Sequence, residues 1–176
     1  MRRTTDAFRT ALDAGKTIVG LEPSCTLMFR DEVVNLIPDW TDDMGAQVLT
    51  FAEYIVQNPI KAVAKPGTQV LVHGHCHQKA MGVAQATVDA VNAIEGADAR
   101  MIESSCCGMA GAFGYQAETQ DVSRQMAELS LAPAVRAAPD DAVIVADGFS
   151  CRCQISDVAQ REALNLAVIL DRVLDG

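Results

Sequence analysis

Residues 69–79, QVLVHGHCHQK, join an apolar stretch typical of a β-strand to a turn that carries Cys76 between two histidines. The stretch is mostly apolar rather than cleanly alternating, as strands covered on both faces are. Glycine favours a break in a strand, so we expect this strand to end near Gly74 or His75. The stretch therefore predicts a buried strand that delivers a thiol just beyond its carboxyl end.

Three further apolar runs follow the same pattern, at 17–21 (TIVGL), 99–104 (ARMIES) and 142–147 (AVIVAD). Segments with helical periodicity separate or follow these runs, and we expect their apolar stripes to pack in the core. The segments are Met44 to Ile55, ending before Pro59; Met81 to Val91, ending before Gly96; Val122 to Leu129; and Ala163 to Leu174, with Ser156 or Asp157 as N-cap. The order predicts an α/β fold, a mainly parallel sheet of about four strands with helices on both faces.

Composition and charge exclude several classes of protein. The chain of 176 residues suits one compact domain, and its formal net charge of −9 argues against nucleic acid or an anionic membrane surface as a partner. No apolar run is long enough for a transmembrane segment, and the N-terminal stretch has no apolar core of a secretion signal. We therefore expect a cytoplasmic protein with reduced thiols, peripheral attachment to the inner face of the membrane through a partner being the alternative.

Every cysteine in the sequence lies just beyond an expected strand. The six are Cys25, Cys76, Cys106, Cys107, Cys151 and Cys153. Because the carboxyl ends of parallel strands form one edge of a sheet, the fold is expected to bring these thiols to a common rim. Adjacent cysteines rarely close a disulfide without strain, and neighbouring thiolates repel each other unless a cation neutralises them. The pattern therefore predicts a metal centre.

The segment 104–115, SSCCGMAGAFGY, places glycines at every third position after its cysteine pair. We expect Gly108, Gly111 and Gly114 to let the backbone wrap closely around a bulky group and to donate N–H groups to it. Several thiolates converging on one point favour an iron–sulfur cluster. The glycines are therefore expected to bind this cofactor.

Two other interpretations of the cysteines remain open from the residues alone. A structural zinc site is one, although the C-x-C spacing at 151–153 is tighter than the C-x-x-C of zinc ribbons. Thiol-based redox or catalysis, with Cys106 or Cys107 as a nucleophile activated by histidine, is the other. His75 and His77 are possible further ligands, but a histidine in this position is more often a hydrogen-bonding neighbour of the ligands.

The sequence contains a faint internal repeat. Residues 16–25, KTIVGLEPSC, align with residues 142–151, AVIVADGFSC, so that Ile, Val, Ser and Cys coincide. Each copy is a predicted buried strand that runs into a turn ending in Ser-Cys. The downstream copy follows two further strand–helix units, whereas the upstream copy has almost nothing before it. This difference indicates that the chain is the second half of a larger arrangement.

Taken together, HCH, SCCGMAGAFG and GFSC resemble the motifs of the cysteine-rich CCG domain family. That family includes components of heterodisulfide reductase and of anaerobic glycerol-3-phosphate dehydrogenase, glycolate oxidase iron–sulfur subunits and lactate-utilisation proteins. The longer motifs LEPSC, VHGHCHQK, ESSCCGMAGAFGY and ADGFSCRCQI look closest to the C-terminal region of large FAD-linked oxidases. The resemblance covers essentially the whole chain. It implies that residues 1–60 are the tail of a first CCG repeat with a connecting helix, and that residues 61–176 are the second repeat.

The resemblance also implies a ligand set. Cys76 matches the cysteine that opens the repeat, Cys106 and Cys107 match its pair, and Cys151 matches the second cysteine of a closing C-x-x-C. The first cysteine of that closing pair falls at Gly148, so the chain departs from the family pattern there.

Two further cysteines have weaker counterparts in the family. Cys153 either replaces the ligand missing at position 148 or only lies nearby. Cys25 matches the closing cysteine of the first repeat, whose other ligands this sequence does not contain. We therefore expect Cys153 to be a ligand and Cys25 to be a possible ligand.

For function, the resemblance implies an iron–sulfur cluster, most simply of the 4Fe-4S type, that passes electrons from a flavin to an acceptor. The flavin, FAD, would belong to a dehydrogenase domain or subunit that oxidises a 2-hydroxy acid such as lactate, glycolate or 2-hydroxyglutarate, and a ferredoxin-like module is a further expected partner. The sequence itself contains neither a ferredoxin C-x-x-C-x-x-C run nor a recognisable flavin site. We therefore expect an oxidoreductase component that does not oxidise substrate alone.

Overall fold

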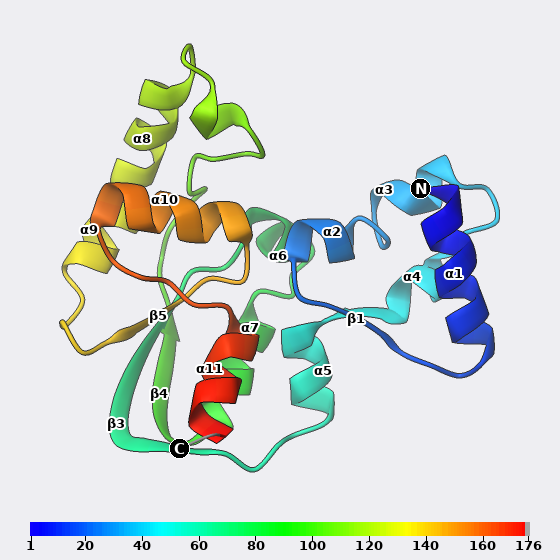
Figure 1. Ribbon diagram of the computed structural model, residues 1–176, viewed down its shortest axis with the longest axis horizontal. Coiled ribbons are helices and arrows are strands. Elements are labelled where there is room, and N and C mark those ends of the chain that lie inside the picture. Colours follow the sequence, from blue (N-terminus) through cyan, green and yellow to red (C-terminus); the bar gives the residue numbers. More distant parts are fainter. Residues whose placement is uncertain (175–176) are drawn as a thin grey trace.

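The computed structural model describes residues 1–174 as alternating helices and short strands (Figure 1). The last two residues of the expected unit 61–176 lie outside this range. The strands are β1 (Ile18–Gly20), β2 (Val48–Thr50), β3 (Val63–Val72), β4 (Glu95–Met101) and β5 (Val143–Val145). The helices are α1 (Arg2–Asp13), α2 (Pro23–Leu27), α3 (Glu32–Leu36), α4 (Asp42–Ala46), α5 (Phe51–Gln57), α6 (Cys76–Ala80), α7 (Gln85–Asn92), α8 (Gln120–Glu128), α9 (Leu131–Arg136), α10 (Phe149–Ala159) and α11 (Leu166–Leu174), with a 3₁₀ turn, η1 (Phe113–Tyr115).

Within residues 1–174, five strands form two sheets, and every pairing between named strands is parallel. β1 pairs with β2, and a three-stranded sheet has the order β4-β3-β5. The predicted α/β class and parallel arrangement are confirmed. The sequence patterns predict one sheet without β2, whereas the strands divide into two sheets.

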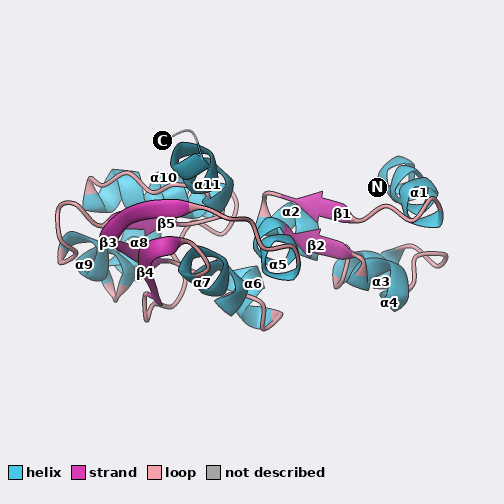
Figure 2. Cartoon of the chain, turned by 90° about the horizontal axis from the view of Figure 1, so that it is seen from below, coloured by secondary structure: helices cyan, strands magenta, loops and turns pink. Residues whose placement is uncertain are grey.

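Helices cover both faces of the three-stranded sheet. One face, which includes Leu71 and Ile144, packs against α9 and α10 in a core of fully buried side chains. The other face, which includes Val72 and Val145, packs against α5, α7 and α11. Figure 2 shows α7 and α10 on opposite sides of this sheet. Because both faces are covered, the strands read as continuous apolar runs rather than alternating ones.

The N-terminal region has a separate small core. Phe8 of α1 lies 4.8 Å from Phe29 between ring centroids, and Trp40 closes the group. The indole N–H of Trp40 donates to the carbonyl oxygen of Phe29 at 2.8 Å, so this buried ring also meets its hydrogen-bonding requirement. This core holds α1, α3 and α4 at the end of the molecule away from β3 and β5 (Figure 1).

The internal repeat of the sequence has a structural counterpart. β1 leads into α2 and β5 leads into α10, and in each case Ser-Cys lies in the first turns of the helix. β1 then pairs in parallel with β2, which continues into α5. In the same way Val145 of β5 forms a parallel bridge with Leu164, which continues into α11. The two halves therefore share an order of elements as well as a sequence pattern.

The helix predicted from Met44 to Ile55 is wrong as a single element. The segment forms α4, then β2, then α5, which ends before Pro59 as expected. Thr50 begins α5 with a capping box: its Oγ1 accepts from the Glu53 N–H at 3.3 Å, while its own N–H donates to the Glu53 carboxylate at 2.9 Å. Val48 is buried as predicted, but on a strand instead of a helix.

Two other helix expectations need correction. α8 exists, but Val122 and Leu129 from its predicted core stripe are 48% and 77% exposed, because the helix turns Ser123 and Ala127 inward. The segment predicted as the last helix and its N-cap belongs to two helices, α10 and α11, and neither of the two predicted residues is an N-cap. Ser156 and Asp157 lie inside α10, and the side chain of Asn165 accepts from the Ala167 N–H at 2.9 Å at the start of α11. The side chains at 173 and 174, part of the predicted last stripe, lie outside what the structure describes.

Candidate metal centre

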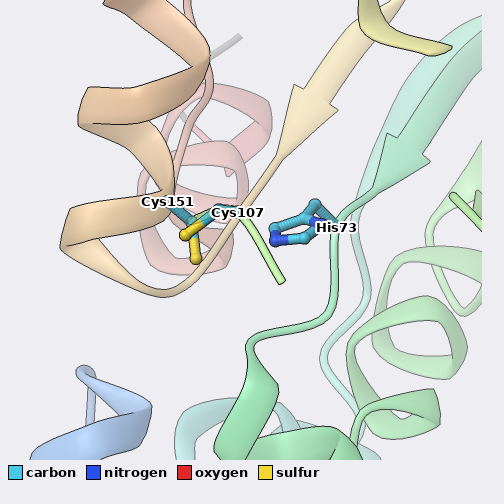
Figure 3. A group of neighbouring side chains, drawn as sticks. All are labelled: His73, Cys107 and Cys151. Carbon is cyan, nitrogen blue, oxygen red and sulfur yellow. The ribbon is translucent and has the colours of Figure 1, made fainter. Parts of the chain in front are cut away.

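Three buried side chains from different loops meet at the carboxyl edge of the three-stranded sheet (Figure 3). His73 is 1% exposed, Cys107 3% and Cys151 1%. Their potential ligand atoms, one ring nitrogen and two sulfurs, all lie within 4.8 Å of one another. Figure 3 shows the edge of the His73 ring directed at the two sulfur atoms. We refer to these three residues as the buried cluster.

The strands explain why the buried cluster forms. Leu71 faces the core that contains Cys107 and Cys151, and strand periodicity places His73, two residues later, on the same side. The N–H of His73 donates to the carbonyl oxygen of Val145 at 2.8 Å, which extends the parallel ladder past the end of β3. The same edge therefore receives His73 from β3, Cys107 from the loop after β4 and Cys151 from α10 after β5.

Charge within the buried cluster is unevenly shared between its two thiols. A hydrogen bond from Cys151 is the main cause that lowers the pKa of Cys107 to about 4, with further lowering by His73 and the Met109 backbone, against the opposing effect of burial. The same hydrogen bond raises the pKa of Cys151, and burial adds to that rise. Of the two thiols, Cys107 is therefore the one that loses its proton more readily.

Cys76 and Cys106 are two half-buried thiols beside the buried cluster. Burial raises the pKa of Cys76, and the hydrogen bond and charge of Cys106, followed by the charge of Cys107, raise it further. The N–H of Gly108 donates to the Cys106 sulfur at 3.2 Å. The structure therefore brings Cys76, Cys106, Cys107 and Cys151 into electrostatic contact at one rim.

A lysine supports the loop that carries the cysteine pair. The ammonium group of Lys79 donates to the carbonyl oxygens of Ser104 and Ser105 at 2.5 and 3.1 Å. Its positive charge also acts on Cys76, whose pKa it lowers against the larger raising effects. Lys79 therefore anchors the loop and offsets part of the negative charge that thiolates concentrate here.

A buried polar network lies beneath the rim. The carboxylate of Asp147, directly after β5, accepts from Thr87 at 3.0 Å, from the Gln78 amide at 3.3 Å and from the Leu166 N–H at 3.1 Å. Gln78 in turn accepts from the backbone N–H of His75 at 3.0 Å. This network ties β5, α6, α7 and α11 together, so the loops that carry the thiols rest on a rigid base.

The two histidines predicted as possible ligands lie apart from the buried cluster. Nδ1 of His75 accepts from the His77 backbone N–H at 3.2 Å, and its Nε2 lies 3.3 Å from Ser24 Oγ, so both ring nitrogens are engaged. Nε2 of His77 is buried and lies 3.5 Å from a carboxylate oxygen of Asp31. In this structure His75 acts as a helix cap that contacts the N-terminal region, and His77 faces Asp31.

Two predicted cysteines are not brought to the buried cluster. Cys153 lies two residues beyond Cys151 on α10 and lines a surface recess together with Tyr115, whose pKa a hydrogen bond with Cys153 raises. Residues two positions apart on an α-helix point to nearly opposite sides, so Cys153 points away from the buried cluster that contains Cys151. Cys25 is exposed and lines an apolar cavity between α1 and β1.

The three predicted glycines have different surroundings. Gly108 adopts a left-handed φ of 92°, and a Cβ there would stand 2.2 Å from the carbonyl oxygen of Ser123, so only glycine lets the loop approach α8 so closely. Gly111 also has a positive φ, of 68°, but open space around it. Gly114 packs against Met109, and its N–H donates to the Met109 carbonyl oxygen at 3.1 Å. Of the three N–H groups, that of Gly108 donates to a cysteine sulfur.

The donor set fits a metal-bound group. Deprotonated thiolates and neutral imidazole nitrogen are the forms that bind metals, and the buried cluster holds a readily deprotonated thiol and an imidazole Nε2 without a hydrogen-bond partner. Ligand sulfurs on one tetrahedral ion with bonds of about 2.3 Å stand roughly 3.8 Å apart, within the observed 4.8 Å limit. A cluster of several irons would spread its thiolates further and include Cys76 and Cys106. Burial of Cys107 gives a substrate little access to its sulfur.

His73 is the residue of the buried cluster that the sequence motifs do not single out. The available signal is its spacing from Leu71: a strand that ends at Val72 still imposes its alternation on the next residue. Asp147 and Gln78 are also missing from the predicted site, because their hydrogen bonds join segments far apart in the chain.

These features define an α/β protein with a rim lined by thiols and an imidazole. Known proteins are similar to it in sequence. The chain is 28% identical to D-2-hydroxyglutarate dehydrogenase of Escherichia coli K12 over 160 residues, which is 89% of the chain and 15% of that protein. It is 30% identical to the D-2-hydroxyglutarate dehydrogenase of Pseudomonas putida KT2440 over 162 residues, 91% of the chain and again 15% of the relative.

A second kind of relative covers a larger share of its own length. The chain is 23% identical over 150 residues to a component polypeptide of the anaerobic glycerol-3-phosphate dehydrogenase of Escherichia coli K12, covering 80% of the chain and 36% of that polypeptide. The chain thus spans about 15% of the length of the D-2-hydroxyglutarate dehydrogenases it matches. No protein-family model matches it, and no solved structure does either. The chain is therefore similar to parts of dehydrogenases.

Among residues 1–174, no helix combines the length and the apolar character that crossing a bilayer requires.

Proposed function

We propose that the chain is an iron–sulfur electron-transfer domain of a flavin-linked dehydrogenase that oxidises a 2-hydroxy acid of the lactate, glycolate or 2-hydroxyglutarate type. The observation that carries this proposal is the convergence of four thiols, from segments that follow three different strands, on one rim where Cys107 and Cys151 are buried and Cys76 and Cys106 are half-buried. Similarity to parts of D-2-hydroxyglutarate dehydrogenases over nine-tenths of the chain supports the flavin-linked class. The chain matches about 15% of the length of these relatives, which fits a component of such an enzyme.

In this proposal the thiolate ligands are drawn from Cys76, Cys106, Cys107 and Cys151, and the cofactor is of the 4Fe-4S type. Such a group, when bound, accepts and releases single electrons. The chain contributes a water-poor pocket, since Cys107 and Cys151 are almost fully buried. The Gly108 N–H donates to the Cys106 sulfur, and the ammonium of Lys79 lies nearby; both favour the more negative, reduced state. Cys153 remains a predicted additional ligand, which a Cys153→Ser variant with unchanged iron content would contradict.

The proposal includes a partner for the N-terminal region. Residues 1–60 repeat the last elements of the unit 61–176, from β1 to α5. In that second unit β5 pairs with β3 on one side and bridges to Leu164 on the other, whereas β1 pairs with β2 alone among the described strands. Beside β1 lies an apolar cavity of about 630 Å³ that Cys25 lines. We propose that a flavin-bearing or ferredoxin-like part of the enzyme covers this surface.

Anaerobic purification followed by iron, sulfide and zinc analysis tests the cofactor. We expect a brown protein with iron and sulfide, broad absorbance near about 400 nm and an electron paramagnetic resonance signal in one of its redox states. Reduced free flavin should bleach the absorbance, whereas D-2-hydroxyglutarate alone should not. A colourless protein that contains only zinc would contradict the proposal.

A structural zinc site is the second candidate, because the buried cluster is compact enough for one ion. In that case Cys107, Cys151 and His73 bind zinc, and Cys76 stays a free thiol. Alkylation of the native protein separates the two: under the zinc hypothesis Cys76 and Cys106 react with iodoacetamide, and under the iron–sulfur proposal both are protected.

A further inference from the structure

The imidazole of His73 has a ring nitrogen, Nε2, without a hydrogen-bond partner of acceptable geometry, although the ring lies close enough to the Cys107 sulfur to lower the pKa of that thiol. The side chain is 1% exposed, and its Nε2 is buried with no hydrogen-bond partner. A buried polar atom without a partner loses the water it had in the unfolded chain and gains nothing in return. Such an atom in a well-packed site indicates that a further group completes its surroundings.

The other ring nitrogen fixes the direction in which Nε2 points. Nδ1 lies 2.8 Å from the Ser104 hydroxyl oxygen, which also accepts from the ammonium of Lys79 at 3.4 Å. In the tautomer whose Nδ1–H donates to Ser104, Nε2 carries the lone pair of the ring. The backbone N–H of His73 is held by the Val145 carbonyl, so both ends of the residue are fixed.

Among residues 1–174, His73 is the only histidine whose ring nitrogen lies within 4.8 Å of two buried cysteine sulfurs. We propose that His73 is a direct ligand of the same metal centre as Cys107 and Cys151, so that the centre is held by nitrogen as well as sulfur. This inference rests on the proposed function for the identity of the centre. The hydrogen bond from Nδ1 to Ser104 is the usual way in which a protein orients a ligating histidine.

His77 provides a contrast within the same loop. Its Nε2 is also buried without a hydrogen bond, but a carboxylate of Asp31 stands 3.5 Å away, and the side chain is 16% exposed. His75 uses both its nitrogens in other contacts. Of the three histidines in the sequence, His73 is therefore the one placed to ligate together with cysteine sulfurs, whereas His77 groups with the carboxylates of Asp31 and Glu32.

A histidine ligand changes the electronic properties of an iron–sulfur centre. Imidazole is neutral where a cysteine ligand is a thiolate, so the centre carries one negative charge fewer and is easier to reduce. His73 would therefore give this centre a higher reduction potential than an all-cysteine one in the same pocket.

The first test uses the unaltered protein and so does not depend on the folding of a variant. X-ray absorption is measured at the edge of whichever metal elemental analysis finds, and pulsed electron paramagnetic resonance compares protein with ¹⁴N- and ¹⁵N-labelled histidine. We expect one nitrogen scatterer per metal centre, which is one per four irons in a 4Fe-4S cluster, and a hyperfine coupling that changes with the isotope. An all-sulfur shell would overturn the inference. Zinc with one nitrogen would instead overturn the iron–sulfur proposal and leave His73 as a ligand.

The second test assigns the nitrogen to His73 with a matched pair of variants. We expect His73→Gln to lose the histidine coupling and at least about tenfold in metal retention against a chelator, and His77→Gln to keep both. His73→Cys should retain metal, lose the coupling and show a lower reduction potential. Persistence of the coupling in His73→Gln, or its loss in His77→Gln, would show that His73 is not the ligand.

Discussion

Two regions of the molecule carry the same local motif in very different surroundings. β1 leads through a turn to Ser24 and Cys25, and β5 leads through a turn to Ser150 and Cys151. Cys25 is exposed, whereas Cys151 is 1% exposed and lies in the buried cluster with His73 and Cys107. The strand–turn–helix motif positions a thiol in both places, but it does not by itself build a site.

The difference arises from what packs against each motif. Cys151 meets His73, which follows β3, and Cys107 from the loop after β4; β3 is the neighbour of β5, and β4 lies beyond β3 in the same sheet. Among the described residues β1 has no second neighbouring strand, and its cysteine lines a cavity instead. A thiol therefore becomes a candidate ligand here only when adjacent parallel strands deliver partners to it.

The largest effect, on metal content, should come from replacing the cysteine of one motif by serine and comparing it with the same replacement in the other motif. Cys151→Ser removes a proposed ligand from the buried cluster, so we expect metal content to fall by roughly tenfold or more. Cys25→Ser is the matched control and should leave metal content and visible absorbance unchanged. Metal-to-protein ratio after anaerobic purification measures both. Equal losses in the two variants would show that the regions are not functionally distinct.

The next effect concerns the loop that buries Cys151 and has no counterpart beside Cys25. Gly108→Ala combines a positive φ with a Cβ 2.2 Å from a backbone oxygen, and should lower the free energy of unfolding by about 2–4 kcal/mol. Gly111→Ala has the positive φ alone and should cost about 1 kcal/mol. Urea unfolding monitored by circular dichroism compares them. Similar losses would mean that close packing on α8 does not position the loop.

A smaller effect is expected from an ion pair in the N-terminal region. The guanidinium of Arg30 donates to both carboxylate oxygens of Glu53 at 2.9 Å. Burial, the largest influence, raises the pKa of Glu53, but the hydrogen bonds from Arg30 and Thr50 together lower it below its ordinary value. Glu53→Gln should therefore reduce the free energy of unfolding at pH 7 by about 1–3 kcal/mol.

The pH dependence of this contribution has a definite sign. Because the folded-state pKa of Glu53 is depressed, its stabilisation is complete above the unfolded pKa of about 4.5 and is lost as pH falls through the folded value. Unfolding free energies measured from pH 7 to pH 3 should converge for wild type and Glu53→Gln. A constant difference over that range would contradict the ion-pair explanation.

The smallest effect should come from the seam between the two regions. A carboxylate oxygen of Glu22, at the start of α2, accepts from the Phe149 N–H at the first turn of α10 at 2.8 Å. Glu22→Gln keeps an acceptor but removes the charge at a helix N-terminus, so we expect a loss of about 0.3–1 kcal/mol. Differential scanning calorimetry should still show one transition. Two separated transitions would show that the regions unfold independently.

Much of the fold could be predicted from local patterns. The strands predicted at 17–21, 69–75, 99–104 and 142–147 all exist, although β3 begins at Val63 and β4 at Glu95, earlier than predicted, and parallel pairing is confirmed. The errors share one cause, that periodicity does not report what a segment packs against. Val48 fits a helical stripe as well as it fits a strand, and Val122 of α8 is exposed because the helix turns Ser123 and Ala127 inward instead.

The candidate site divides in the same way. The sequence by itself determined that each cysteine follows a strand and that parallel strands end at a common edge, because these properties depend on local propensity and chain direction. Only the tertiary structure decided which of those side chains meet. His73 joins Cys107 and Cys151, while Cys153 turns toward Tyr115 and Cys25 remains exposed. The physical reason is that such contacts depend on strand order and helix rotation, which involve residues distant in the chain.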